Sequence, residues 1–215
     1  MRDGKLDDAA LLLGRLAEQA PDRPRHLLQL GRILLRLGRH EILREELTRW
    51  HRETPEAPEW HILRGGLLAA RGDLAGAARE YAAALASRSD AATVLLHAQA
   101  VLDVEGPERA LQTLDSHAAT VPLDSACRAL RGVALARLGR REEAEQEFAH
   151  AVAAAGAAEL PVVLRQLRAA LAPDRALTVC LGVLPASRGP TLTQHVIQML
   201  IQTGRMDEAR TELRR

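Results

Sequence analysis

Histidine is the side chain most often used for proton transfer and metal binding near neutral pH. The chain has eight, at His26, His40, His51, His61, His97, His117, His150 and His195. No two are four residues apart and none belongs to an HExxH motif, the spacings that place two imidazoles on one helix face around a metal ion. We therefore predict no metal site and no cofactor.

The other reactive side chains are equally scattered. Cys127 and Cys180 stand apart, without a CxxC motif, and are interpreted as two small core residues in a reducing compartment. The acidic pair Glu142–Glu143 is expected to begin a helix, where negative charge favours the helix dipole. No GxSxG motif, Walker-type loop or GxGxxG motif occurs. The sequence thus predicts a protein that is not an enzyme.

Composition favours helices and excludes two classes of partner. Aromatic residues make up only 2% of the 215 residues, and alanine and leucine supply most of the apolar side chains, which suits closely packed helices. The 29 basic and 28 acidic residues nearly cancel, so there is no bulk attraction for nucleic acid. No signal peptide or apolar run of roughly 20 residues is visible. We expect an all-α, cytoplasmic protein that binds neither nucleic acid nor membrane.

The elements that position these residues follow an internal repeat. A helix breaker recurs at intervals of 34, 34, 34, 33, 34 and 31 residues, at Gly4, Gly38, Gly72, Gly106, Gly139, Pro173 and Gly204. About five residues after each comes a mostly small residue, at Ala9, Leu43, Ala77, Ala110, Ala144, Ala176 and Ala209. Each period therefore predicts a helix, a tight turn and a second helix, with the small residue where the two helices come closest.

Glycines inside the first helices strengthen this interpretation. Gly31, Gly65 and Gly132 occupy the same phase of the repeat. A glycine inside a helix costs about 1 kcal/mol relative to alanine, so three at one phase indicate a crossing too close for a side chain.

The repeat resembles that of the tetratricopeptide family, a 34-residue helix-turn-helix. The best match carries Trp60, Gly65, Leu68, Ala77, Tyr81 and Ala84, and the next carries Gly132, Leu135, Ala144, Phe148 and Ala151. The resemblance implies a right-handed superhelical solenoid of antiparallel helix-turn-helix repeats that spans the chain as one domain. We divide it into a partial unit 1–23, full units 24–57, 58–91, 92–124, 125–158 and 159–189, and a partial unit 190–215.

Some positions depart from the family pattern. Leu43 and Trp50 replace the usual alanines, so the unit 24–57 is expected to pack more widely. Pro185 and Pro190 lie in a shortened connection, where we expect a kink.

The resemblance also implies that the first helices line a concave groove. Assigned by phase, the groove residues are Arg25, Gln29, Arg32, Arg36, Ile62, Gly66, Leu96, His97, Ala100, Val133, Arg137, Val163, Leu167, Gln194 and Gln198. This groove would be basic at its N-terminal end, apolar in the middle and lined by amides at its C-terminal end.

From these expectations we predict that the protein is a non-catalytic interaction scaffold, which binds a peptide or helical segment of a partner protein in the groove. Two alternatives remain open. The chain is the substrate-positioning arm of a larger bacterial enzyme, sulfotransferase-like or glycosyltransferase-like, or it self-assembles through uncapped terminal repeats.

Overall fold

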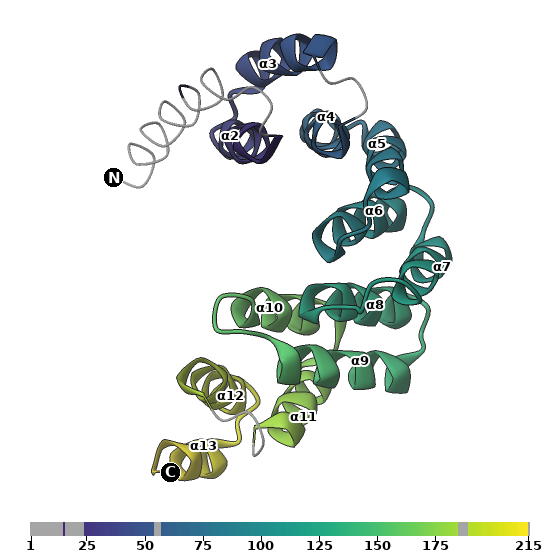
Figure 1. Cartoon of the computed structure of the whole chain (residues 1–215). Coiled ribbons are helices and arrows are strands. Elements are labelled where there is room, and N and C mark those ends of the chain that lie inside the picture. The colour runs from purple at the N-terminus through teal and green to yellow at the C-terminus, as the bar shows by residue number, and fades with distance from the viewer. Residues whose placement is uncertain (1–14, 16–23, 54–56, 185–188, 215) are drawn as a thin grey trace. The chain divides into compact units, whose positions relative to one another are not determined.

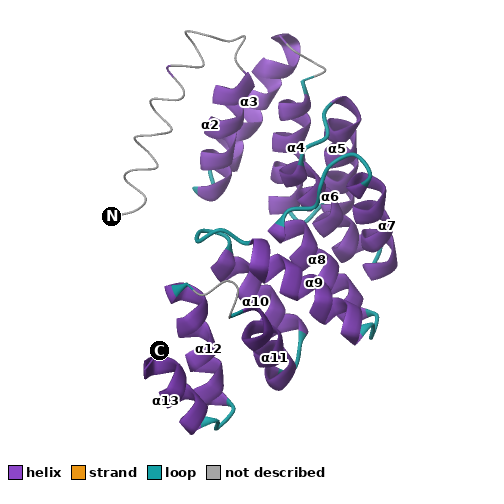
Figure 2. Ribbon diagram, turned by 60° about the horizontal axis from the view of Figure 1, so that its bottom comes forward, coloured by secondary structure: helices purple, strands orange, loops and turns teal. Residues whose placement is uncertain are grey.

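The computed structural model of the chain describes residues 15, 24–53, 57–184 and 189–214. Within these ranges every regular element is an α-helix, as Figure 2 shows. The all-α repeat fold predicted from the sequence is therefore confirmed. The predicted partial unit 1–23 falls, apart from Arg15, outside the described residues, and Pro185 of the predicted kink also lies outside them.

The helices follow one another in short, similar lengths, and Figure 1 labels them along the chain. They are α2 (Pro24–Arg36), α3 (His40–Glu53), α4 (Pro58–Ala70), α5 (Leu74–Ser87), α6 (Ala91–Val104), α7 (Pro107–Ala118), α8 (Ser125–Arg137), α9 (Arg141–Ala154), α10 (Leu160–Ala170), α11 (Pro173–Val183), α12 (Pro190–Gln202) and α13 (Met206–Arg214).

The chain forms two compact units, Met1–Val104 and Glu105–Arg215. Helices α2 to α6 belong to the first unit and α7 to α13 to the second. The boundary falls inside the predicted repeat 92–124, between α6 and α7. The repeat boundaries drawn from the sequence stay a prediction.

The turn glycines adopt the backbone conformation that the repeat requires. Gly72 and Gly139 have φ of 86° and 76°, the left-handed region in which a side chain is strained. After each glycine the next backbone N–H reaches back to the helix: that of Asp73 donates to the Leu68 carbonyl and that of Arg140 to the Leu135 carbonyl, both at 3.0 Å. These bonds satisfy carbonyls at the helix end and reverse the chain within two residues.

The glycines inside the first helices lie at close crossings, as predicted. A Cβ added to Gly65 would stand 2.6 Å from the Tyr81 ring on α5, and one added to Gly132 would stand 2.9 Å from the Phe148 ring on α9. Both rings are buried. Each glycine therefore provides the space for an aromatic ring of the second helix, which holds the hairpin together.

The small residues after the turns are core residues. The alanines at this position in the second helices α5, α7, α9 and α11 are completely buried: Ala77, Ala110, Ala144 and Ala176. The predicted close approach of paired helices accounts for this burial, because any larger side chain would separate them.

Candidate functional site

A line of polar side chains covers the exposed face of α2. Arg25, Gln29, Arg32 and Arg36 follow at spacings of four, three and four residues, which places them on one face of the helix. All four are exposed, and no ion pair joins the three arginines to another described side chain. We call these four residues the α2 surface. It presents three guanidinium groups that carry five N–H donors each.

The remaining predicted groove residues of the first unit differ in exposure. Ile62 on α4 and Ala100 on α6 are buried, so both contribute to the core. Gly66 and His97 are half-buried, and Leu96 is exposed. On these helices the predicted set thus mixes core and surface positions.

The second unit shows the same division. Arg137 on α8 and Gln194 and Gln198 on α12 are exposed, and Val133 is half-buried. On α10, Val163 and Leu167 are buried among the apolar residues that pack this helix into the unit. Whether the predicted set forms a binding groove stays a prediction.

The outer face of α10 carries a different set of residues, which the sequence did not single out. Pro161, Arg165 and Arg168 are exposed and, with His195 of α12, line a shallow pocket of about 250 Å³. Arg168 Nη2 donates to Gln202 Oε1 at 3.2 Å, which links the two helices. The apolar stripe of α10 includes both Val163 and Leu164, so the exposed face lies opposite the phase that the repeat predicted.

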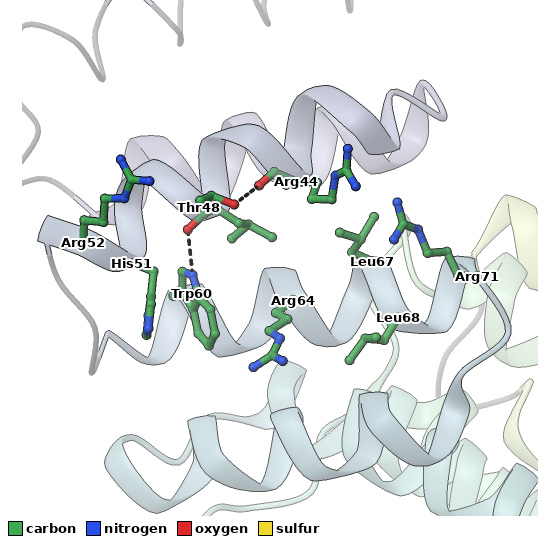
Figure 3. Close-up of a pocket in the computed structure, with 10 residues that line it drawn as sticks. Arg44, Thr48, His51, Arg52, Trp60, Arg64, Leu67, Leu68 and Arg71 are labelled. Atoms are coloured by element: carbon green, nitrogen blue, oxygen red, sulfur yellow. Dashed lines mark hydrogen bonds between the residues drawn. The ribbon is translucent and has the colours of Figure 1, made fainter.

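A larger pocket of about 470 Å³ lies between α3 and α4 in the first unit (Figure 3). Its apolar wall is formed by Leu47 of α3 and by Trp60, Leu67 and Leu68 of α4. The Trp60 indole Nε1 donates to the Leu47 carbonyl at 3.0 Å, which fixes the ring and satisfies its only donor. The pocket therefore has a preformed apolar wall.

Three side chains hold the Trp60 ring from other directions. The His51 imidazole stacks on it with ring centroids 4.6 Å apart, and His61 meets it edge-on at 5.0 Å. The Arg64 guanidinium lies 5.0 Å from the ring centroid, in a cation–π arrangement. Only 8% of Trp60 is exposed, so the ring is a rigid element of the wall.

Four arginines surround this apolar wall: Arg44, Arg52, Arg64 and Arg71. Figure 3 shows Arg52 beside His51 at one end of the pocket, Arg64 near its middle, and Arg44 and Arg71 toward the other end. We call the cavity with these four residues the arginine pocket.

The described carboxylates balance only part of this charge. Glu41 pairs with both Arg44, at 2.5 Å, and Arg71, at 2.9 Å. Glu80 pairs with Arg64 at 2.9 Å and also contacts His61 at 2.8 Å. For Arg52, no ion pair with another described residue is found. Four cations thus face two shared carboxylates, which leaves the pocket positively charged among its described residues.

The sequence did not predict this pocket. Leu43 and Trp50 of α3 are buried in the core of the first unit, and the wider packing that they led us to expect in the unit 24–57 stays a prediction. The arginines escaped notice because they lie outside the positions that define the repeat. The spacing of Arg44, Thr48 and Arg52, four residues each, is the signal that places them on one helix face.

Three properties of the described part of the chain bear on metal binding, thiol reactivity and membrane insertion. There, no three His, Cys, Asp or Glu side chains gather closely enough to hold a metal ion. Burial raises the pKa of the Cys180 thiol to about 12, and burial together with the nearby Asp124 carboxylate raises that of Cys127 to about 12. No helix among the described residues has the length and apolar character needed to cross a membrane.

Comparison with known proteins supports the repeat. A family model described as "Tetratricopeptide repeat" matches residues 1–41 and 42–92. No match was found among curated proteins.

Solved structures extend the likeness over the rest of the chain. A thermophilic tetratricopeptide-repeat protein of Thermus thermophilus is 21% identical with a TM-score of 0.63, covering 76% of this chain and 91% of its own. YrrB, described as having an unusual peptide-binding site, is 15% identical with a TM-score of 0.55, over 86% and 97%. The Cut9–Hcn1 hetero-tetramer of the APC/C is 17% identical with a TM-score of 0.63, and the match covers 98% of this chain and 42% of that chain.

The chain thus spans less than half of the Cut9–Hcn1 chain that it matches. At these identities the solved structures establish the fold alone. The family model, the positive-φ turn glycines and the buried alanines and aromatic rings at the repeat positions agree with one another. Residues 1–92 of this chain therefore match the tetratricopeptide-repeat family, and the solved structures show that its fold continues beyond them.

Proposed function

We propose that this protein is a non-catalytic scaffold whose α2 surface binds a peptide or helical segment of a partner protein. Tetratricopeptide-repeat proteins act generally as protein-interaction scaffolds. The α2 surface is the N-terminal, basic part of the groove that the sequence predicts. The proposal includes the cytoplasmic location expected from the sequence.

The observation that carries the proposal is the unpaired charge of α2. Arg25, Arg32 and Arg36 are exposed on one face without an ion pair to another described residue. Other arginines of the first unit, such as Arg71 and Arg88, already pair with carboxylates. Guanidinium groups that are not committed to internal pairs are available to the carboxylates of a partner.

Two of the similar solved structures support a peptide or protein as the partner. YrrB is described as having a peptide-binding site, and the Cut9–Hcn1 structure is an assembly of protein chains. An acidic peptide with apolar side chains at i, i+3 and i+4 would pair with the α2 arginines while its apolar face covers half-buried residues such as Leu35.

The test selects a ligand first and then maps it. Peptides selected from a displayed random library on the immobilised full chain would be labelled with a fluorophore and titrated by anisotropy. We expect the double variant Arg32→Glu/Arg36→Glu to weaken the best peptides by at least about tenfold, because two attractions become repulsions.

Arg79→Glu is the matched control. Arg79 is exposed on α5, forms no ion pair with another described residue, and undergoes the same Arg→Glu change as each of the two α2 arginines. It should leave the affinity within about twofold. If the selected peptides bind both variants as tightly as they bind the unchanged protein, the α2 surface is not the binding site. Light scattering of the same samples would show whether self-association accounts for any signal.

A further inference from the structure

We propose that the arginine pocket between α3 and α4 is a second peptide-binding site, which takes a short acidic segment with one apolar side chain. The apolar side chain would enter between Trp60 and Leu67, and carboxylates on either side of it would pair with the arginines at the two ends. This site uses residues of α3 and α4 together with Arg71, which directly follows α4, and none of the α2 surface, so it stands independently of the proposed function.

The composition of the pocket defines the chemistry of its ligand. Leu47, Trp60 and Leu67 offer an apolar wall with no free donor, because the indole N–H is already bonded. The charged groups at its edge are all cationic apart from the two carboxylates that they already share. A ligand that matches both features is apolar at its centre and anionic at its flanks.

Distances along the helices set the spacing of those flanks. Arg44 and Arg52 are eight residues apart on α3, which corresponds to a rise of roughly 12 Å. An extended chain advances about 3.3 Å per residue, so two carboxylates about four residues apart reach both ends. The central residue between them then lies over Trp60 and Arg64, near the middle of the pocket (Figure 3).

A peptide fits this pocket better than a nucleic acid. A polynucleotide is held by basic groups along an extended backbone and by aromatic faces that stack on its bases. In this pocket the His51 imidazole already stacks on the Trp60 ring, in the place where a base would stack. The chain as a whole carries a net charge of only +1, which gives little attraction for a polynucleotide. A pocket with alternating apolar and cationic groups favours a side chain flanked by carboxylates.

The probe is a fluorescein-labelled peptide with the core Glu-Glu-Leu-Glu-Glu, titrated with the full chain at low ionic strength. Two control peptides separate its features: Gln-Gln-Leu-Gln-Gln lacks the charges and Glu-Glu-Ser-Glu-Glu lacks the apolar group. We expect each to bind at least about fivefold more weakly than the probe. Equal binding of the serine peptide would overturn the role of the apolar wall.

Two variants change the affinity in opposite directions. Arg52→Glu removes a cation from one end, and we expect it to weaken the probe by about tenfold. Glu41→Gln releases Arg44 and Arg71 from their shared carboxylate, and we expect it to tighten binding about twofold to fivefold. A general loss of structure cannot tighten binding, so an unchanged or weaker affinity for Glu41→Gln would overturn the proposal.

Competitors and the α2 variants identify the source of any signal. If millimolar sodium sulfate or a short oligothymidylate displaces the probe as effectively as unlabelled peptide does, the pocket binds anions in general and the proposal is wrong. At a salt concentration of about 0.15 M, which screens distant charges, Arg32→Glu/Arg36→Glu should leave the probe's affinity nearly unchanged, whereas Arg52→Glu should leave that of peptides of the α2 surface nearly unchanged. Failure of one site is therefore distinguishable from failure of the other.

Discussion

At the scale of single residues, the environment of a side chain decides whether its chemistry is available. Cys127 and Cys180 have no exposed surface, and burial raises the pKa of both thiols to about 12. The thiol group reacts as its anion, so a raised pKa lowers the reactive fraction at neutral pH. Both cysteines are therefore core residues, as the sequence predicted.

A labelling experiment checks this assignment. At pH 8, about four pH units below a pKa of about 12, only about one thiol in ten thousand is ionised in the folded protein. We expect iodoacetamide to modify both cysteines at least about a hundredfold more slowly than in concentrated urea, where burial is lost. Single Cys127→Ala and Cys180→Ala variants assign the two rates. Folded-state labelling as fast as that in urea would contradict the burial of these thiols.

Residue-scale prediction from the sequence succeeded where the repeat pattern dictates packing. The positions of Ala77 and Gly65 follow from the close crossing of two helices, which only small residues permit. Exposure was harder to predict, because Val163 and Leu167 are buried although the repeat phase placed them toward the groove. Burial depends on how neighbouring helices rotate against α10, and a single-helix pattern does not contain that rotation.

At the scale of elements, a hairpin depends on a glycine that accommodates an aromatic ring. Gly132 of α8 faces the buried Phe148 ring of α9, as Gly65 of α4 faces Tyr81 of α5. A helix gains stability when glycine becomes alanine, by up to about 1 kcal/mol, provided that the new methyl group has room. In the second unit, Gly132 has no room for a methyl group and Gly182 has room, so alanine at these two positions separates the gain in helix stability from the loss in packing.

Gly132→Ala is expected to destabilise the protein by about 1–3 kcal/mol in urea unfolding, because its Cβ would press on the Phe148 ring. Gly182→Ala is the matched control: this helical glycine of α11 is exposed and a Cβ there meets nothing within 4 Å. We expect it to stabilise by about 0.5–1 kcal/mol. Combining Gly132→Ala with Phe148→Leu should recover part of the loss. Equal stability of the two alanine variants would exclude the close crossing.

The arginine pocket also belongs to the element scale. The repeat predicted that α3 and α4 would be neighbours, and Leu43 and Trp50 led us to expect wider packing of the unit 24–57, which stays a prediction. The pocket itself could not be predicted, since it depends on the orientation of Trp60, which the bond from its indole N–H to the Leu47 carbonyl fixes. That bond joins residues of two consecutive repeats.

At the scale of the whole molecule, the 34-residue period predicted the order of the described helices. Glycine turns and buried alanines repeat along the chain because every repeat solves the same packing problem. The division into units Met1–Val104 and Glu105–Arg215 was not predicted, since the period continues through the boundary between α6 and α7. A period in the sequence reflects only the packing that all repeats have in common. The boundary between the two units depends on how the contacts are distributed along the folded chain, which the period does not contain.

The central claim is that this scaffold binds a partner peptide through the exposed face of α2. The most direct measurement is a chemical-shift titration of the isotope-labelled chain with a library-selected peptide that Arg32→Glu/Arg36→Glu weakens. We predict that the largest amide shifts fall on α2, around Arg25 to Arg36, with smaller shifts on adjoining residues of α4. Shifts confined to helices of the second unit, with α2 unchanged at saturation, would contradict it.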